Sequence, residues 1–288
     1  MKRLSLLLLF VVVPLAAACS SDTFSVDPVA KAAETTSRVD TMHMSMKMRM
    51  TVPGMAPVTM TADGAFDNTA ERGSMTLDMS DFARQIPAGQ ALADPKLWRG
   101  EEVFDFSKSL VLYMHFPFMS KALPGSKPWI RIDMEQLGKR VGLDFGALMQ
   151  SSQSNPTQQL DYLRSVSGDL KELGKETVGG VETTHYRGMV DLGEYVKLVP
   201  EDQRARVRKT IQQLETSMGG RSSYPVDVWV DSSDRVRRMA FDMKVDTPQG
   251  TATTSMQMDF SDFGAPVHVD LPAKSQTMDF DQLTQAAG

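Results

Sequence analysis

The chain has 288 residues, carries a formal net charge of −5, and contains 41% hydrophobic and 23% charged residues. This composition is typical of a folded globular protein and is too apolar for a disordered chain. A mildly acidic chain lacks the basic footprint of a nucleic-acid-binding protein, so no nucleic-acid partner is expected. The unusual count is that of methionine, which occurs 21 times.

The N-terminus has the pattern of an export signal. Two basic residues, Lys2 and Arg3, precede an almost unbroken apolar stretch from Leu4 to Val13. That stretch falls short of the roughly 20 residues that span a bilayer, and small residues follow it, as in a cleaved signal peptide. We therefore predict a signal peptide over residues 1–18.

Cys19 is the only cysteine of the chain and stands directly after this segment. The arrangement resembles the bacterial lipobox, in which cleavage precedes the cysteine and its sulfur carries diacylglycerol. The usual box has leucine three residues before the cysteine, whereas Leu15 stands four before. An ordinary secretory signal with an incidental cysteine is the alternative. We expect residues 19–26 to tether one domain, residues 27–288, to the outer face of the cell membrane.

Two patterns follow the tether. Asp27 and Pro28 predict the N-cap and first residue of a helix that runs to about Val39. Residues 41–50 then alternate strictly between methionine and polar residues, which predicts a half-buried strand. The methionines of its apolar face are Met42, Met44, Met46, Met48 and Met50.

Further segments that alternate between apolar and polar residues, each bounded by turn residues, predict the other strands of a sheet. The expected strands are residues 57–66, 73–80, 101–106, 109–116, 129–133, 173–178, 181–191, 225–231, 235–246 and 252–263. With the methionine strand they form an antiparallel sheet of ten or eleven strands in an α+β fold.

Helical patterns interrupt these strands over residues 135–165 and after Pro200. Val207 and Ile211 begin an apolar stripe on the second helix, which ends at Gly219-Gly220. The same helix carries a basic run, Arg204 to Lys209, that is typical of a solvated face. Contact of that run with anionic lipid head groups is the alternative.

Four segments carry a family resemblance. They are Pro128 to Asp133, Gly174 to Tyr186, Pro225 to Met239, and Phe260 to Val267. Together they resemble the actinobacterial LppX/LprG-type lipoproteins and, more distantly, the LolA/LolB-like fold. The resemblance implies a strongly curved half-barrel sheet that helices close around an apolar cavity for the acyl chains of lipids or lipidated molecules. The turn Ser232-Ser233-Asp234 departs from the relatives, which commonly have glycine there.

The methionine distribution agrees with such a cavity, because methionine is flexible and polarisable and lines adaptable apolar surfaces. Ordinary core packing is the alternative for any one of these residues. The residues predicted to line the cavity are Met44, Met46, Met48, Met60, Met75, Leu77, Leu112, Met114 and Ile130.

A copper site is the second hypothesis for the methionine strand. Alternating methionines beside His43 resemble the thioether sites that hold Cu(I). A regular strand, however, directs His43 to the face opposite the methionines. We therefore expect neither a metal nor a cofactor.

The sequence offers little for catalysis. The histidines are too widely separated for a zinc motif, and neither a nucleophile elbow nor a glycine-rich phosphate loop occurs. His185 is interpreted as a strand-face partner of Tyr186 and not as a general base. We expect no enzyme but a lipid-binding lipoprotein that carries lipids across the cell envelope to an export partner. An envelope sensor or scaffold with a filled core is the alternative.

Overall fold

The computed structural model describes residues 27–122, 127–141, 166–191, 193, 196–197, 201–217, 223–247 and 250–282. The predicted signal peptide, Cys19 and the tether lie outside these residues, as does most of the helical pattern expected over residues 135–165.

The described chain is dominated by strands. They are β1 (Thr41–Thr51), β2 (Val58–Asp67), β3 (Arg72–Asp78), β4 (Arg99–Asp105), β5 (Val111–His115), β6 (Trp129–Asp133), β7 (Val166–Val178), β8 (Val181–Asp191), β9 (Ser223–Asp231), β10 (Val236–Thr247), β11 (Gly250–Ser261) and β12 (Thr277–Asp279). The helices are α1 (Pro28–Ser37), α2 (Pro117–Ala122), α3 (Met134–Val141) and α7 (Glu201–Ser217), with short 3-10 helices η1 (Ser80–Gln85), η2 (Pro95–Trp98) and η4 (Lys274–Gln276).

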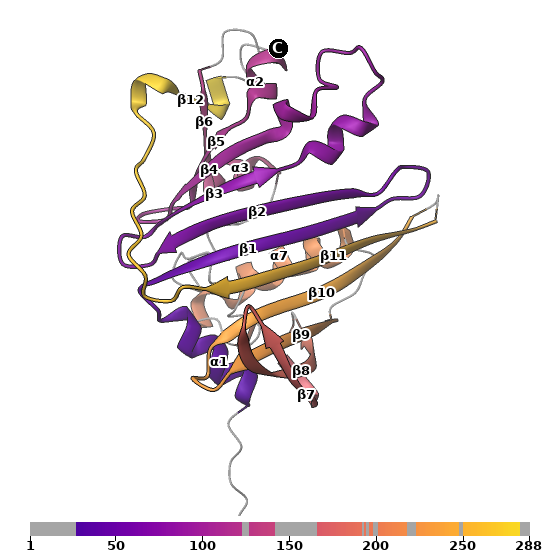
Figure 1. Cartoon of the computed structure of the whole chain (residues 1–288), viewed down its shortest axis with the longest axis vertical. Coiled ribbons are helices and arrows are strands. Elements are labelled where there is room, and N and C mark those ends of the chain that lie inside the picture. Colours follow the sequence, from indigo (N-terminus) through magenta and orange to yellow (C-terminus); the bar gives the residue numbers. More distant parts are fainter. Residues whose placement is uncertain are drawn as a thin grey trace, which may run out of the picture.

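All twelve strands belong to one open sheet (Figure 1). Its order is β12-β6-β5-β4-β3-β2-β1-β11-β10-β9-β8-β7, so β12 and β7 are unjoined edges. Every neighbouring pair is antiparallel except β12 and β6, which run parallel. Figure 1 shows α7 behind the sheet, near β11.

The predicted sheet is largely confirmed. Each of the eleven predicted strands is present, although β7 begins at Val166, seven residues before the predicted start. The prediction of a wholly antiparallel sheet of ten or eleven strands is wrong, because Thr277–Asp279 adds a parallel twelfth strand. Three residues are too few to show an alternating pattern, so this strand left no periodic signal.

The first helix is also confirmed. The Asp27 carboxylate caps α1 by accepting hydrogen bonds from the amides of Val29, at 2.8 Å, and Ala30, at 3.2 Å. Val29 is fully buried and belongs to the same hydrophobic core as Met42 and Met44. The Thr36 hydroxyl fastens the helix to β10, since it accepts a 2.8 Å hydrogen bond from the amide of Val236. Helix α1 thus packs against β9 and β10 and contributes to the core.

The β9–β10 hairpin is organised around a buried carboxylate. Asp231 accepts hydrogen bonds from the amides of Ser233 and Arg235, at 2.8 and 3.0 Å, and from Nε of Arg237, at 2.6 Å. Burial alone raises the pKa of Asp231, but these hydrogen bonds together hold it below the usual aspartate value. Asp234 has a φ of 53°, so the turn uses the left-handed backbone for which glycine is the usual choice. The sequence departure therefore affects only the turn.

Asp231→Asn is expected to lower the free energy of unfolding by about 3 kcal/mol, because an amide leaves partly buried guanidinium groups without their counter-charge. Urea denaturation measures this change. Asp234→Asn is the control, since it removes only an exposed ion pair with Lys31 and asparagine tolerates the left-handed backbone. Equal losses in the two variants would contradict the buried pairing as the source of stability.

Candidate functional site

The strand register places all nine predicted cavity residues on one face of the sheet. Paired residues on neighbouring strands point to the same face, and each strand alternates between faces. One row crosses eight strands in the order Met278, Ile130, Met114, Glu102, Met75, Gly64, Met44 and Phe260. A second row contains Leu77, Ala62, Met46, Met258 and Met239. A third contains Met60, Met48, Met256 and Phe241.

Leu112 completes the set, because it stands two residues before Met114 on β5 and so shares its face. We call this surface the apolar face. The sequence alone brings together neighbours along one strand, whereas the register places the nine predicted residues, from β1, β2, β3, β5 and β6, on one surface. That these residues line a cavity stays a prediction.

Burial varies along the apolar face. Ile130, Met75, Leu77 and Met44 are buried, with exposed fractions between 2% and 9%. The other predicted residues are only half-buried: Met46, Met48, Met60, Leu112 and Met114. Beyond Met48 the β1–β2 hairpin exposes Val52 and Met55. The apolar face therefore has a packed region and a region that is not fully covered.

Gly64 leaves room for the side chain of Met75 on the apolar face. A Cβ atom on Gly64 would lie 2.6 Å from the Cγ atom of Met75, well inside van der Waals contact. Gly64 stands between Met44 and Met75 in the first row. The missing side chain thus leaves space that Met75 occupies.

Glu102 interrupts the apolar face. It stands between Met75 and Met114 in the first row and is half-buried. Among the described residues, it is the only ionisable side chain of this face on the strands from β12 to β10, and none of them gives it a hydrogen bond or ion pair. Burial raises the pKa of Glu102 to about 7. Glu102 could not be recognised from the sequence, because Glu101 and Glu102 are adjacent and only the register shows which one points inward.

The Glu102 carboxyl is expected to make stability depend on pH. Its folded pKa of about 7 lies above the ordinary value of 4.5, so the folded protein holds the proton more tightly than the unfolded chain does. The resulting stability is complete below about pH 4.5 and is lost as the pH rises to about 7, by at most roughly 3 kcal/mol.

As the pH rises from 4 to 8, the free energy of unfolding of Glu102→Gln is therefore expected to increase relative to that of the wild type. Urea denaturation at both pH values measures the gain, and other titrating groups cancel in the comparison. Glu101→Gln, on the exposed outer face of the same strand, is the matched control and is expected to follow the wild-type profile. A Glu102→Gln profile parallel to the wild type would show that the carboxyl is not desolvated.

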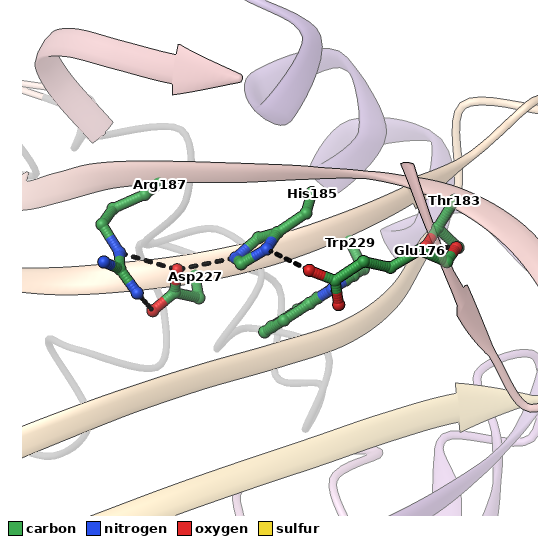
Figure 2. A network of polar contacts seen from close by, with 6 residues as sticks. All are labelled: Glu176, Thr183, His185, Arg187, Asp227 and Trp229. Atoms are coloured by element: carbon green, nitrogen blue, oxygen red, sulfur yellow. Dashed lines mark hydrogen bonds and ion pairs between the residues drawn. The ribbon is translucent and has the colours of Figure 1, made fainter. Parts of the chain in front are cut away.

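The opposite face, which we call the outer face, carries a polar network across β7, β8 and β9 (Figure 2). His185 lies at its centre, with Nδ1 2.9 Å from the Glu176 carboxylate and Nε2 2.7 Å from the Asp227 carboxylate. Arg187 donates two further hydrogen bonds to Asp227, at 2.8 and 3.0 Å. The Trp229 ring stacks on the imidazole at a centroid distance of 4.1 Å. The network therefore encloses the histidine on several sides.

This geometry opposes a general-base role for His185, because carboxylate oxygens already occupy both ring nitrogens. Trp229 Nε1 also donates a 2.8 Å hydrogen bond to Glu176. That bond, followed by the contact with His185, lowers the pKa of Glu176. The predicted pairing of His185 with Tyr186 is wrong, since successive strand residues lie on opposite faces. The network fastens three strands together.

The copper hypothesis gains no support from the position of His43. Its Nε2 atom lies 3.1 Å from Asp63 and its Nδ1 atom 3.4 Å from the Ser261 hydroxyl. These residues belong to the outer face, so His43 points away from the methionines, as predicted. Within the described ranges, no group of three or more histidine, cysteine, aspartate or glutamate residues is placed to hold a metal ion. In the same part of the chain, no helix has the length and apolar character needed to cross a membrane.

Comparison with curated proteins gives partial matches. The chain is 28% identical over 164 residues to a 31.2 kDa Streptomyces griseus protein encoded between rplA and rplJ, covering 57% of this chain and 52% of that protein. It is 27% identical over 167 residues to a candidate lipoprotein of Streptomyces coelicolor, covering 57% and 46%. The chain thus spans about half the length of the curated relatives it matches. No family model matches it.

Comparison with solved structures gives longer matches. Lipoprotein LppX of Mycobacterium tuberculosis has a TM-score of 0.47 and 15% identity, covering 84% of this chain and 96% of LppX. LprF of Mycobacterium bovis has a TM-score of 0.44 and 14% identity, covering 85% and 95%. A LolA superfamily protein of Nitrosomonas europaea has a TM-score of 0.27 and 11% identity, covering 87% and 96%. LppX, LprF and a LolA superfamily protein are thus among the solved structures to which this chain is similar. The function is argued from this chain's own residues.

Proposed function

We propose that the protein is a lipoprotein that binds acyl chains of lipids or lipidated molecules against the apolar face and carries them across the cell envelope to an export partner. In this proposal it is not an enzyme, and it is held at the outer face of the cell membrane through Cys19. The single observation that carries the proposal is the register, which joins the nine predicted residues into one apolar surface.

The incomplete burial of this surface supports a binding role. A close-packed core leaves few side chains partly exposed, whereas Met46, Met48 and Met60 are half-buried together on the neighbouring strands β1 and β2, and Leu112 and Met114 are half-buried on β5 of the same face. Contiguous apolar surface that remains accessible is typical of binding sites. Three of the five are flexible thioethers of β1 and β2 that adapt to a ligand of variable shape.

The energetics of an acyl ligand fit a carrier better than a store. Burying about 15 methylenes at ~0.8 kcal/mol each gives roughly 12 kcal/mol relative to water. A chain drawn from a bilayer forfeits nearly all of this free energy, because it was already out of water. Uptake and release are then nearly balanced, so a lipid passes from donor to acceptor without a deep energetic trap.

The proposed anchor keeps this exchange close to the membrane. Residues 19–26 separate Cys19 from the N-cap of α1, and eight extended residues reach about 27 Å. Cys19 with two or more acyl chains anchors stably, where a single chain holds only marginally. The anchored protein would therefore work within one domain diameter of its lipid source.

Met46→Trp tests the binding surface. If Met46 borders open space, the larger ring fits without strain, thermal stability stays near that of the wild type, and uptake of a fluorescent fatty-acyl probe is lost. In a filled core the same change overpacks and destabilises by about 1–3 kcal/mol. Lys47→Trp, one residue away on the exposed outer face, is the control and is expected to keep both properties. Unfolding of Met46→Trp, or unchanged probe uptake, would favour a sensor or scaffold with a filled core.

Cys19→Ala tests the anchor. The variant has no thiol that can take diacylglycerol, because Cys19 is the only cysteine. We expect fatty-acid label on the wild-type protein to disappear from the variant, and the variant to leave the membrane fraction or stay unprocessed. Undiminished labelling would contradict the lipoprotein assignment.

A further inference from the structure

Glu102 is placed where a purely apolar ligand would be a poor fit. Its cross-strand partners are Met75 on β3 and Met114 on β5, and the next residues of the same face on its own strand are Gly100 and Phe104. The remaining described neighbours of that face on β3 and β5 are Gly73, Leu77 and Leu112. None of these side chains donates or accepts a hydrogen bond strongly, and none is ionisable.

A plain alkyl chain lying over Glu102 would remove water from the carboxyl without supplying a hydrogen bond in its place. An unmade hydrogen bond of a buried polar group is costly, and more so when the group is charged. A ligand that brings a hydroxyl or amide group to the same place would restore the lost hydrogen bond. The same apolar face would then distinguish the two kinds of ligand.

We propose that Glu102 is a specificity-determining residue that selects amphiphiles carrying a hydroxyl or amide group along their apolar part over plain alkyl chains. The inference rests on the proposed function and names the class of ligand that the apolar face takes.

Two further observations support this role. The raised pKa of Glu102 leaves the carboxyl able to donate or accept a hydrogen bond near neutral pH. It can therefore accept a hydrogen bond from a ligand hydroxyl group or donate one to its oxygen. The residue also breaks an otherwise apolar row, where methionine or leucine would fit the local pattern. Departures from local consistency that reduce stability are typical of functional positions.

The experiment compares octadecanoate with hydroxyoctadecanoates that carry one hydroxyl at different positions along the chain. Displacement of a fluorescent fatty-acyl probe from the full mature protein gives the affinities. Wild type is expected to bind at least one positional isomer about tenfold more tightly than octadecanoate. Glu102→Met is expected to remove this preference and to bind octadecanoate at least as well as the wild type does.

Two control variants separate specificity from folding. Glu102→Gln keeps a hydrogen-bonding group and is expected to retain the preference for the hydroxylated chain. Glu101→Gln lies on the outer face of the same strand and is expected to leave every affinity unchanged. Circular dichroism establishes that each variant is folded.

The outcomes are distinct. Equal affinities of wild type for all chains, or a preference that survives in Glu102→Met, would overturn the selective role while leaving acyl binding in place. Failure of wild type to bind any of the chains or the probe would overturn the proposed function, and this inference with it.

Discussion

The register of β1 between β2 and β11 is the constraint on which the rest of the structure depends. Because side chains alternate strictly along a strand, a slip of one residue would move every methionine of β1 to the outer face and every polar residue inward. Such a slip would place polar neighbours such as His43 and Ser45 in the core positions that Met42 and Met44 occupy. Burial at one end of the strand therefore fixes the facing of the half-buried methionines at the other end. The half-buried part of the apolar face therefore keeps its apolar composition without being close-packed itself.

The outer face holds the register in place by other means. Arg238 donates two 2.6 Å hydrogen bonds to the Asp259 carboxylate and joins β10 to β11. The His185 network joins β7, β8 and β9 in the same way, with side-chain contacts of 2.7–3.0 Å between these strands. Charged hydrogen bonds with fixed geometry specify one alignment, whereas methionines tolerate several arrangements. The outer face thus specifies how the strands align, whereas the apolar face stays adaptable.

Features that depend on neighbouring residues could be predicted from the sequence, and those that depend on distant partners could not. The strand pattern, the cap at Asp27 and the shared face of Met44, Met46 and Met48 all follow from local periodicity. The twelfth strand could not be predicted, because its three residues are held in a strand by parallel pairing with β6, which is distant in the sequence. The partners of His185 escaped for the same reason, since they come from β7 and β9. Adjacent glutamates hid the inward-pointing Glu102, because alternation shows that one of them faces inward but not which.

A surface that binds acyl chains has to meet two conflicting demands. It must stay apolar enough to displace water. A uniformly apolar surface, however, binds all acyl chains without selectivity and tends to close up when no ligand is bound. If the apolar face binds acyl chains, the half-buried methionines would meet the first demand, because their flexible side chains can cover the surface without a ligand and move aside for one. Under the same proposal, Glu102 would meet the second demand at a cost in stability, because its desolvated carboxyl favours a ligand that brings a polar group. In that proposal, Glu102 belongs to the binding surface and is not a defect in a core.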